Sequence, residues 1–130
     1  MTRRFAYDPA REPAAPVLPL GVAPPLSNAT VLLRGLVDSG ADCTVVPVAI
    51  VRQLELPVVG RVEVAGVTGA PRRMPVYAAA AELPGLRTIV RILAMGTEAI
   101  IGRDLLNRMV ARLDGPAAAV SVERPPRRRR

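Results

Sequence analysis

Apolar and polar positions alternate along several stretches of the chain with the two-residue period of a β-strand. The clearest run covers 58–67, where Val62 and Val64 alternate with Arg61 and Glu63. Other β-branched or aliphatic runs predict strands at 17–22, 30–37, 44–46, 73–81, 86–93 and 99–101. The strand at 17–22 contains Pro19, so we expect it at a sheet edge. The last part of the chain predicts a hairpin over 110–122, with strands at 110–113 and 118–122 and its turn beginning at Asp114-Gly115.

Two short helices interrupt this pattern. Pro47 suits the first helical position, and the three-residue spacing of Val48, Val51 and Leu54 predicts a helix that ends before Pro57. A second helix is predicted over 103–109. The count of elements favours a mostly β fold with one or two short helices.

Turn-forming residues between 66 and 71 join the strand at 58–67 to the strand at 73–81. The pair predicts a long hairpin with glycine at its tip. Arg72 and Arg73 beside this turn are expected to face solvent.

The chain of 130 residues has the length of one domain. Six of its 14 prolines fall within the first 25 residues. We therefore predict an extended, flexible arm at 1–16, a folded domain at 17–122 and a basic tail at 123–130.

Composition narrows the chemistry. Only Phe5, Tyr7 and Tyr77 are aromatic, so an aliphatic core is expected. The chain has no histidine, which excludes Ser-His, Cys-His and His-metal sites. Its single cysteine, Cys43, allows neither an internal disulfide nor a Cys-rich zinc site. Carboxylates, tyrosine, arginine and one thiol remain, and no metal or other cofactor is predicted.

The net charge of +7 raises the question of nucleic-acid binding. More than half of the excess lies in 123–130, where five arginines face one glutamate. The remaining chain is nearly balanced, so a basic groove is not indicated, and only the Arg127–Arg130 run leaves binding to nucleic acid or an acidic partner open. No secretory or membrane-spanning segment is visible in the sequence, and a cytoplasmic location without a membrane partner is expected.

Two segments carry candidate chemistry. In the first, the apolar run ending at Val37 is followed by Asp38-Ser39-Gly40-Ala41-Asp42. A carboxylate placed there requires hydrogen bonds or a partner charge, and glycine permits a tight backbone path. An ordinary strand-ending turn is the simpler interpretation of this segment alone. In the second, Ala99-Ile100-Ile101 runs into Gly102 and then Arg103-Asp104-Leu105-Leu106, which alone is only a strand-to-helix junction.

Together, and with the glycine-bearing hairpin between them, the two segments resemble the retropepsins, the retroviral-type aspartic proteases. That family combines two apolar residues and Asp-Thr/Ser-Gly-Ala with a flap hairpin and a later apolar-apolar-Gly-Arg-Asn/Asp-Leu-Leu. The resemblance spans about 17–122 and is nearer to short cellular members found in bacteria than to viral enzymes. It implies a single-domain closed β-barrel-type fold with a flap hairpin.

The resemblance also implies an aspartic endopeptidase that cleaves extended peptide or protein substrates with an activated water. The chain holds one Asp-Ser-Gly, so the second carboxylate must come from Asp38 of another copy in a two-fold homodimer. The resemblance assigns catalytic positions to Asp38, Ser39 and Gly40.

In this assignment Ser39 bonds across the axis and Gly40 offers its carbonyl to substrate. Substrate contacts are implied for Ala41, Asp42, Gly66, Val67, Thr68, Gly69 and Ile100, and Leu36 and Val46 are further candidates for apolar subsites. Structural support is implied for Gly102, Arg103 and Asp104, with Arg103 pairing with Asp42 and Gly102 allowing close approach to the active-site loop.

Alternatives remain open at this level. The same fold is compatible with a catalytically weak or inactive dimerisation or peptide-binding module, and the arginine tail with a nucleic-acid binder. Cys43 could edge a subsite, although a small packed residue is the simpler interpretation.

Overall fold

The computed structural model describes residues 2–65 and 69–124. The predicted flap-tip residues Gly66, Val67 and Thr68 and the Arg127–Arg130 run lie outside these ranges. The fold is mostly β, as predicted, with two short helices.

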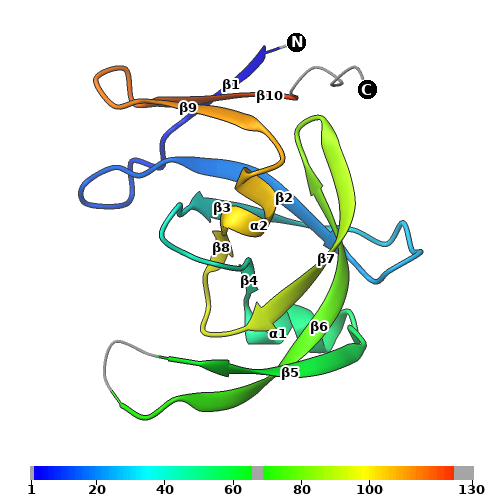
Figure 1. Cartoon of the computed structure of the whole chain (residues 1–130). Coiled ribbons are helices and arrows are strands. Elements are labelled where there is room, and N and C mark those ends of the chain that lie inside the picture. The colour runs from blue at the N-terminus through cyan, green and yellow to red at the C-terminus, as the bar shows by residue number, and fades with distance from the viewer. Residues whose placement is uncertain (1, 66–68, 125–130) are drawn as a thin grey trace, which may run out of the picture.

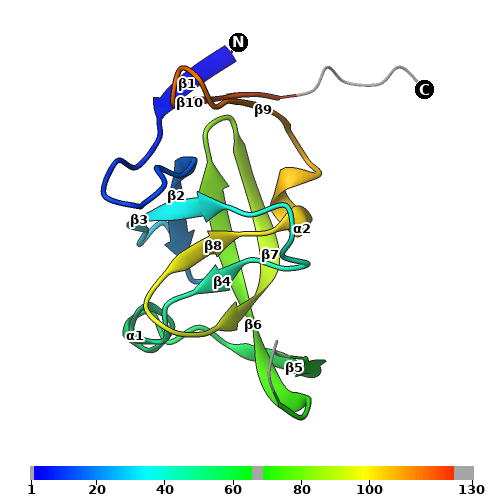
Figure 2. The ribbon, with the colours of Figure 1, turned by 90° about the vertical axis from the view of Figure 1, so that its left-hand side faces the viewer.

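Six strands of one seven-stranded sheet close into a barrel (Figures 1 and 2). The sheet has the order β2-β3-β8-β4-β7-β6-β5, and an additional pairing of β2 with β6 closes the ring and leaves β5 outside it. The strands are β2 (Val17–Ala23), β3 (Val31–Val37), β4 (Val45–Val46), β5 (Val58–Val64), β6 (Arg72–Leu83), β7 (Leu86–Ala94) and β8 (Ala99–Ile101). Pro19 lies opposite Arg34 of β3, whereas β2 pairs with β6 only from Gly21 onward. Pro19 thus lies where β2 has a single pairing partner, but β2 is not an edge strand over its whole length, because its end pairs on both sides and completes the barrel.

Aliphatic side chains fill the barrel, as the scarcity of aromatic residues predicted. Leu18, Leu20, Ile92 and Ile101 are at most 1% exposed. Burying one such side chain fully contributes about 1.5–3 kcal/mol. Val46 is also fully buried in this core, so it cannot line a substrate subsite, and that part of the sequence interpretation is wrong.

The long hairpin predicted between 58 and 81 consists of β5 and β6 and extends from the barrel (Figure 1). The register places Val62 opposite Met74 and Val64 opposite Arg72. Every β5 residue before Val64 is exposed, because no other strand covers β5.

The helices are shorter than predicted. Helix α1 (Val48–Gln53) begins after Pro47, which occupies the capping position with ψ 140° rather than the first helical position. Helix α2 (Arg103–Leu106) ends three residues before the predicted Met109. Residues 107–109 form turns that lead directly into β9, which starts at Val110.

A second, three-stranded sheet covers the end of the barrel opposite the β5–β6 hairpin (Figures 1 and 2). Its order is β1-β10-β9, from β1 (Thr2–Ala6), β10 (Ala119–Glu123) and β9 (Val110–Asp114). The predicted terminal hairpin is thus present. The flexible arm expected at 1–16 is not what the structure shows, because β1 pairs with β10 along its whole length. Phe5 and Tyr7 pack against the core and explain why this proline-rich segment docks.

Candidate active site

The two segments singled out in the sequence meet at the ends of two parallel strands. β3 and β8 pair with Leu36 opposite Ile100 and Val37 opposite Ile101. Asp38 and Gly102 therefore follow at the same level of the sheet. The backbone N–H of Asp38 continues the ladder by donating to the carbonyl of Ile101 at 3.0 Å.

The Asp38 carboxylate is held by its own turn. Its Oδ1 accepts a hydrogen bond from the backbone N–H of Gly40 at 2.9 Å, and its carbonyl accepts one from Ala41 at 3.2 Å. A Cβ at position 40 would lie 3.1 Å from that same Oδ1, so glycine keeps this bond unobstructed. Asp38 is half-buried, while Ser39 and Gly40 are exposed. The carboxylate is fixed in orientation and still reachable from solvent.

Arg103 connects α2 to the loop that follows Asp38. One guanidinium nitrogen donates to the carbonyl of Ser39 at 2.8 Å, and the other pairs with the carboxylate of Asp42. The Arg103 backbone N–H donates to the carbonyl of Ala41 at 2.9 Å. The Asp42 side chain is 88% exposed, so the ion pair alone contributes at most about 1 kcal/mol. The value of this planar fork is geometric, because it fixes two points of the loop at once.

Asp104 holds the end of the same loop. Its carboxylate accepts hydrogen bonds from the backbone N–H of Thr44 at 3.0 Å and from the Thr44 hydroxyl at 2.8 Å. The hydroxyl oxygen in turn accepts the N–H of Gly102 at 3.2 Å. Thr44 is 1% exposed and was not identified from the sequence. The sequence signal for Thr44 was its hydroxyl at the start of the otherwise apolar run 44–46. Such a hydroxyl needs a hydrogen-bond partner when it is buried.

Gly102 allows the two segments to touch. A Cβ at this position would lie 2.6 Å from both the carbonyl carbon and the carbonyl oxygen of Cys43, and 3.0 Å from the carbonyl oxygen of Ala41. No side chain fits there without moving the backbone. The close approach implied by the family resemblance is thus present.

Cys43 lies inside this arrangement and is half-buried. Burial raises the pKa of its thiol, and the neighbouring carboxylates of Asp104 and Asp42 raise the pKa further. The thiol therefore stays protonated at neutral pH, which opposes a role as a nucleophile.

A hollow of about 790 Å³ lies between the turn end of the β5–β6 hairpin and the end of β7. Of the predicted substrate-contact residues in the described chain, only Gly69 lines it. Ala41 and Ile100 are instead half-buried beside the Asp38 loop, and Asp42 is exposed there. The hollow's apolar walls come mainly from Val48, Val64, Pro71, Met74, Ala94 and Met95. Sequence reasoning missed this set, because the contributing side chains come from segments far apart in the chain.

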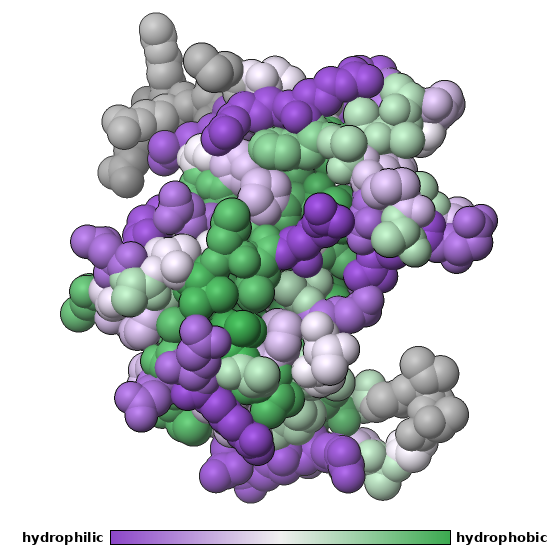
Figure 3. All heavy atoms as spheres, turned by 180° about the vertical axis from the view of Figure 1, so that it is seen from behind, coloured by the Kyte–Doolittle hydropathy of each residue, from purple (hydrophilic) through white to green (hydrophobic). Residues whose placement is uncertain are grey.

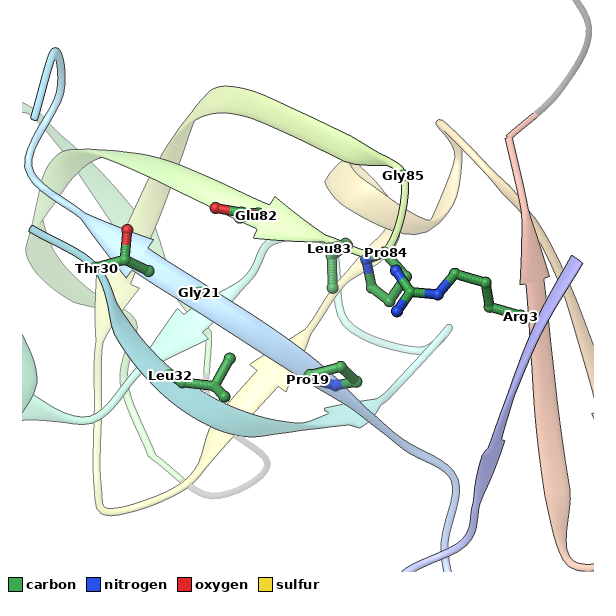
Figure 4. A pocket seen from close by; sticks show the side chains of 9 residues that line it. All are labelled: Arg3, Pro19, Gly21, Thr30, Leu32, Glu82, Leu83, Pro84 and Gly85. Atoms are coloured by element: carbon green, nitrogen blue, oxygen red, sulfur yellow. The ribbon is translucent and has the colours of Figure 1, made fainter. Parts of the chain in front are cut away.

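The surface has two further features. Figure 4 shows a smaller hollow of about 230 Å³ in which Arg3 extends from β1 toward Pro84 at the β6–β7 turn. Seen from behind, apolar residues form a broad area across the middle of the molecule, with hydrophilic residues above and below it (Figure 3). No predicted site residue lines the smaller hollow.

The site contains one free carboxylate in the part of the chain that the structure describes. Asp42 is paired with Arg103, and Asp104 is engaged by Thr44. Within residues 2–65 and 69–124 no three His, Cys, Asp or Glu side chains gather where they could hold a metal ion. None of the helices described there is long and apolar enough to cross a membrane.

Comparison with solved structures identifies the fold. A retropepsin-like aspartic protease from Rickettsia conorii superimposes with a TM-score of 0.67 and 13% identity over 94% of this chain and 89% of that one. The retroviral protease-like domain of Ddi1 from Leishmania major gives a TM-score of 0.50 and 19% identity over 85% and 94% of the two chains. No protein-family model and no curated protein sequence matches the chain. The chain has the fold of the retropepsin-like aspartic proteases.

Proposed function

We propose that this chain is an aspartic endopeptidase whose site is completed by Asp38 of a second copy. The observation that carries the proposal is the Asp38 turn itself. A half-exposed carboxylate lies at the end of β3, oriented by the Gly40 N–H and surrounded by a loop that Arg103 and Asp104 hold at both ends.

The chemistry requires two carboxylates in different protonation states. The ionised one takes a proton from water as the water attacks the peptide carbonyl, and the protonated one donates to the developing oxyanion. Two carboxylates a few ångströms apart share one proton and titrate as a pair. The site of a single chain supplies only Asp38, since Asp42 and Asp104 are both engaged. This is the physical reason for a two-fold dimer.

The substrate in this proposal is an extended peptide lying between the Asp38 loop and the flap hairpin. Such a peptide binds through backbone hydrogen bonds, with alternate side chains entering pockets. The hollow lined by Val64, Met74 and Met95 supports an apolar side chain at one of these positions.

The decisive variant is Asp38→Asn, which keeps the oxygen that accepts the Gly40 N–H and removes the charge. We expect it to reduce cleavage of a diverse peptide library to background, with an unchanged circular dichroism spectrum. The matched control is Glu55→Gln, an exposed carboxylate after α1, which should retain wild-type cleavage. Cleavage that survives Asp38→Asn contradicts the proposal. An inert but dimeric wild-type protein would instead support the alternative of a binding module.

A further inference from the structure

The terminal sheet has two open edges in the described part of the chain, because β10 lies in its middle and β1 and β9 lie outside. An open edge presents a row of backbone N–H and C=O groups that can pair with another strand. The two edges differ in the side chains that accompany them.

Strand β9 presents apolar side chains. Val110 is 47% exposed and Leu113 is 55% exposed. Leu113 pairs with Val120, which is fully buried, so Leu113 lies on the side of the sheet that faces the barrel. An apolar residue on the inner side of an open edge calls for cover from outside the chain.

Strand β1 presents the opposite chemistry. Arg3 and Arg4 occupy its middle and both are exposed. A copy of β1 placed against this edge would bring arginines together, and like charges on neighbouring strands are destabilising. Charged residues on an edge strand are a common protection against such pairing.

The β9 edge is also fixed relative to the proposed active site. Only three residues separate α2 from β9, and Arg103 and Asp104 of α2 bind the loop that follows Asp38. The sheet that contains β9 lies at the barrel end opposite the flap hairpin (Figure 2). Strand β9 is therefore joined through one short helix to the Asp38 loop.

We propose that β9 pairs antiparallel with β9 of a second copy, joining two terminal sheets into one continuous sheet of six strands. This inference rests on the proposed function, because the lone Asp38 is what requires a second copy. It assigns the interface to an edge formed within each subunit, so each subunit keeps its own β1-β10 pairing.

Symmetry restricts the register of this pairing. A two-fold axis perpendicular to the sheet preserves its two sides, and directly opposed residues lie on the same side. The two residues of each opposed pair must therefore differ by an even number in the sequence. As a result one residue lies on the axis, opposite its own copy. If Arg112 lies on the axis, Ala111 pairs with Leu113 of the other copy and the whole strand is used. If Ala111 lies on the axis, Val110 pairs with Arg112 of the other copy and the two arginines are separated.

Cysteine cross-linking tests the interface directly. Four single-cysteine variants are made on a Cys43→Ser background: Ala111→Cys, Arg112→Cys, Ser121→Cys and Arg4→Cys. Opposed residues lie about 4.5–5.5 Å apart at Cα, within reach of a disulfide. We expect mild oxidation to give a covalent dimer for the residue on the axis, at position 111 or 112.

The other two variants are controls. Ser121 lies in the middle strand β10, about 14 Å from its copy in the six-stranded arrangement, and Arg4 lies on the opposite edge. Neither should cross-link. A dimer cross-linked through position 4, or none through 111 and 112 under conditions where the protein sediments as a dimer, overturns the proposal.

A charge substitution gives an independent measurement. Leu113→Arg should raise the dimer dissociation constant at least tenfold in sedimentation equilibrium, with the barrel still folded by circular dichroism. Leu26→Arg is the matched control, because Leu26 is fully exposed in the connection between β2 and β3. An unchanged dissociation constant for Leu113→Arg rejects the β9 interface.

These outcomes separate the interface from the enzymatic function. A wild-type dimer that depends on Asp38 for cleavage but resists both β9 tests leaves the proposed function standing and removes this interface. A β9-linked dimer whose cleavage survives Asp38→Asn leaves the interface standing and removes the proposed function. A strict monomer at every concentration contradicts both.

Discussion

Asp104 binds Thr44 through two hydrogen bonds, one from the backbone nitrogen at 3.0 Å and one from the hydroxyl at 2.8 Å. The Thr44 hydroxyl also accepts the N–H of Gly102. One buried hydroxyl thus links the end of the Asp38 loop, the first turn of α2 and the glycine at which the two segments touch.

Replacing Thr44 with valine should destabilise the fold strongly. The substitution preserves shape but leaves the Gly102 N–H without its acceptor and the Asp104 carboxylate without one donor. Each unmet buried group costs about 1–3 kcal/mol, so we expect a loss of about 2–4 kcal/mol. Urea unfolding measures it. Thr30→Val, an exposed threonine whose hydroxyl makes one 3.4 Å bond, should change stability by less than about 0.5 kcal/mol.

A methyl group at Gly102 should be poorly tolerated. Its nearest neighbours would be backbone atoms of Cys43 at 2.6 Å, which cannot rotate away as a side chain would. We expect Gly102→Ala to cost about 1–3 kcal/mol, the range for overpacking, and to lower cleavage because the Asp38 loop must shift. Gly115→Ala has open space around it and serves as the control. Equal stability of the two variants would show that the loop yields freely.

Arg103→Lys separates positioning from stability. Lysine keeps the positive charge but cannot hold the Ser39 carbonyl and the Asp42 carboxylate with one planar group. Because the ion pair is exposed, the free energy of unfolding should change by less than about 1 kcal/mol. We expect kcat/KM to fall on the order of tenfold or more, since small misplacements of reacting groups are costly. A variant with full activity would mean that the fork does not position the loop.

The Cys43 thiol makes stability depend on pH at the alkaline end. Burial, with smaller effects from Asp104 and Asp42, raises the pKa of the thiol in the folded protein. The folded state therefore keeps this proton to higher pH than the unfolded chain. Between the two pKa values the folded state binds more protons, so stability falls as pH rises through that interval.

The measurement is the free energy of unfolding at a series of pH values from about 7 to 10.5, a range that spans ordinary thiol ionisation. We expect the wild-type curve to fall more steeply than that of Cys43→Ala, in which every other titrating group is retained. Parallel curves would show that the thiol has the same pKa in both states.

The contact between the two segments could be predicted from the sequence because its signals are local. Asp38 and Gly102 each follow a short apolar run, and a parallel pair of such runs brings their ends together. Thr44 was not identified because its partner Asp104 lies 60 residues away. Nothing in the run Thr44-Val45-Val46 specifies that its one hydroxyl becomes buried. Val46 was misplaced for a related reason, since the sequence does not reveal that both residues of the short strand β4 are buried.

The docking of the N-terminal segment could not be predicted for a third reason. Its prolines indicated an unstructured arm, but strand pairing between Phe5 and Val120 depends on a partner more than a hundred residues away. Prolines restrict local conformation without preventing a short strand between them from docking.

Phe5→Ala distinguishes a docked strand from a free arm. Phe5 packs against the core and lies opposite Val120, which is fully buried. Because Phe5 is itself half-buried, the loss should be below that of a fully buried aromatic residue, and we expect about 1–3 kcal/mol in urea unfolding. Leu26→Ala, which truncates a fully exposed side chain in the β2–β3 connection, should leave stability unchanged. If the two variants are equally stable, residues 2–6 do not contribute to the folded core. The edge of β10 that faces away from β9 would then have no docked strand.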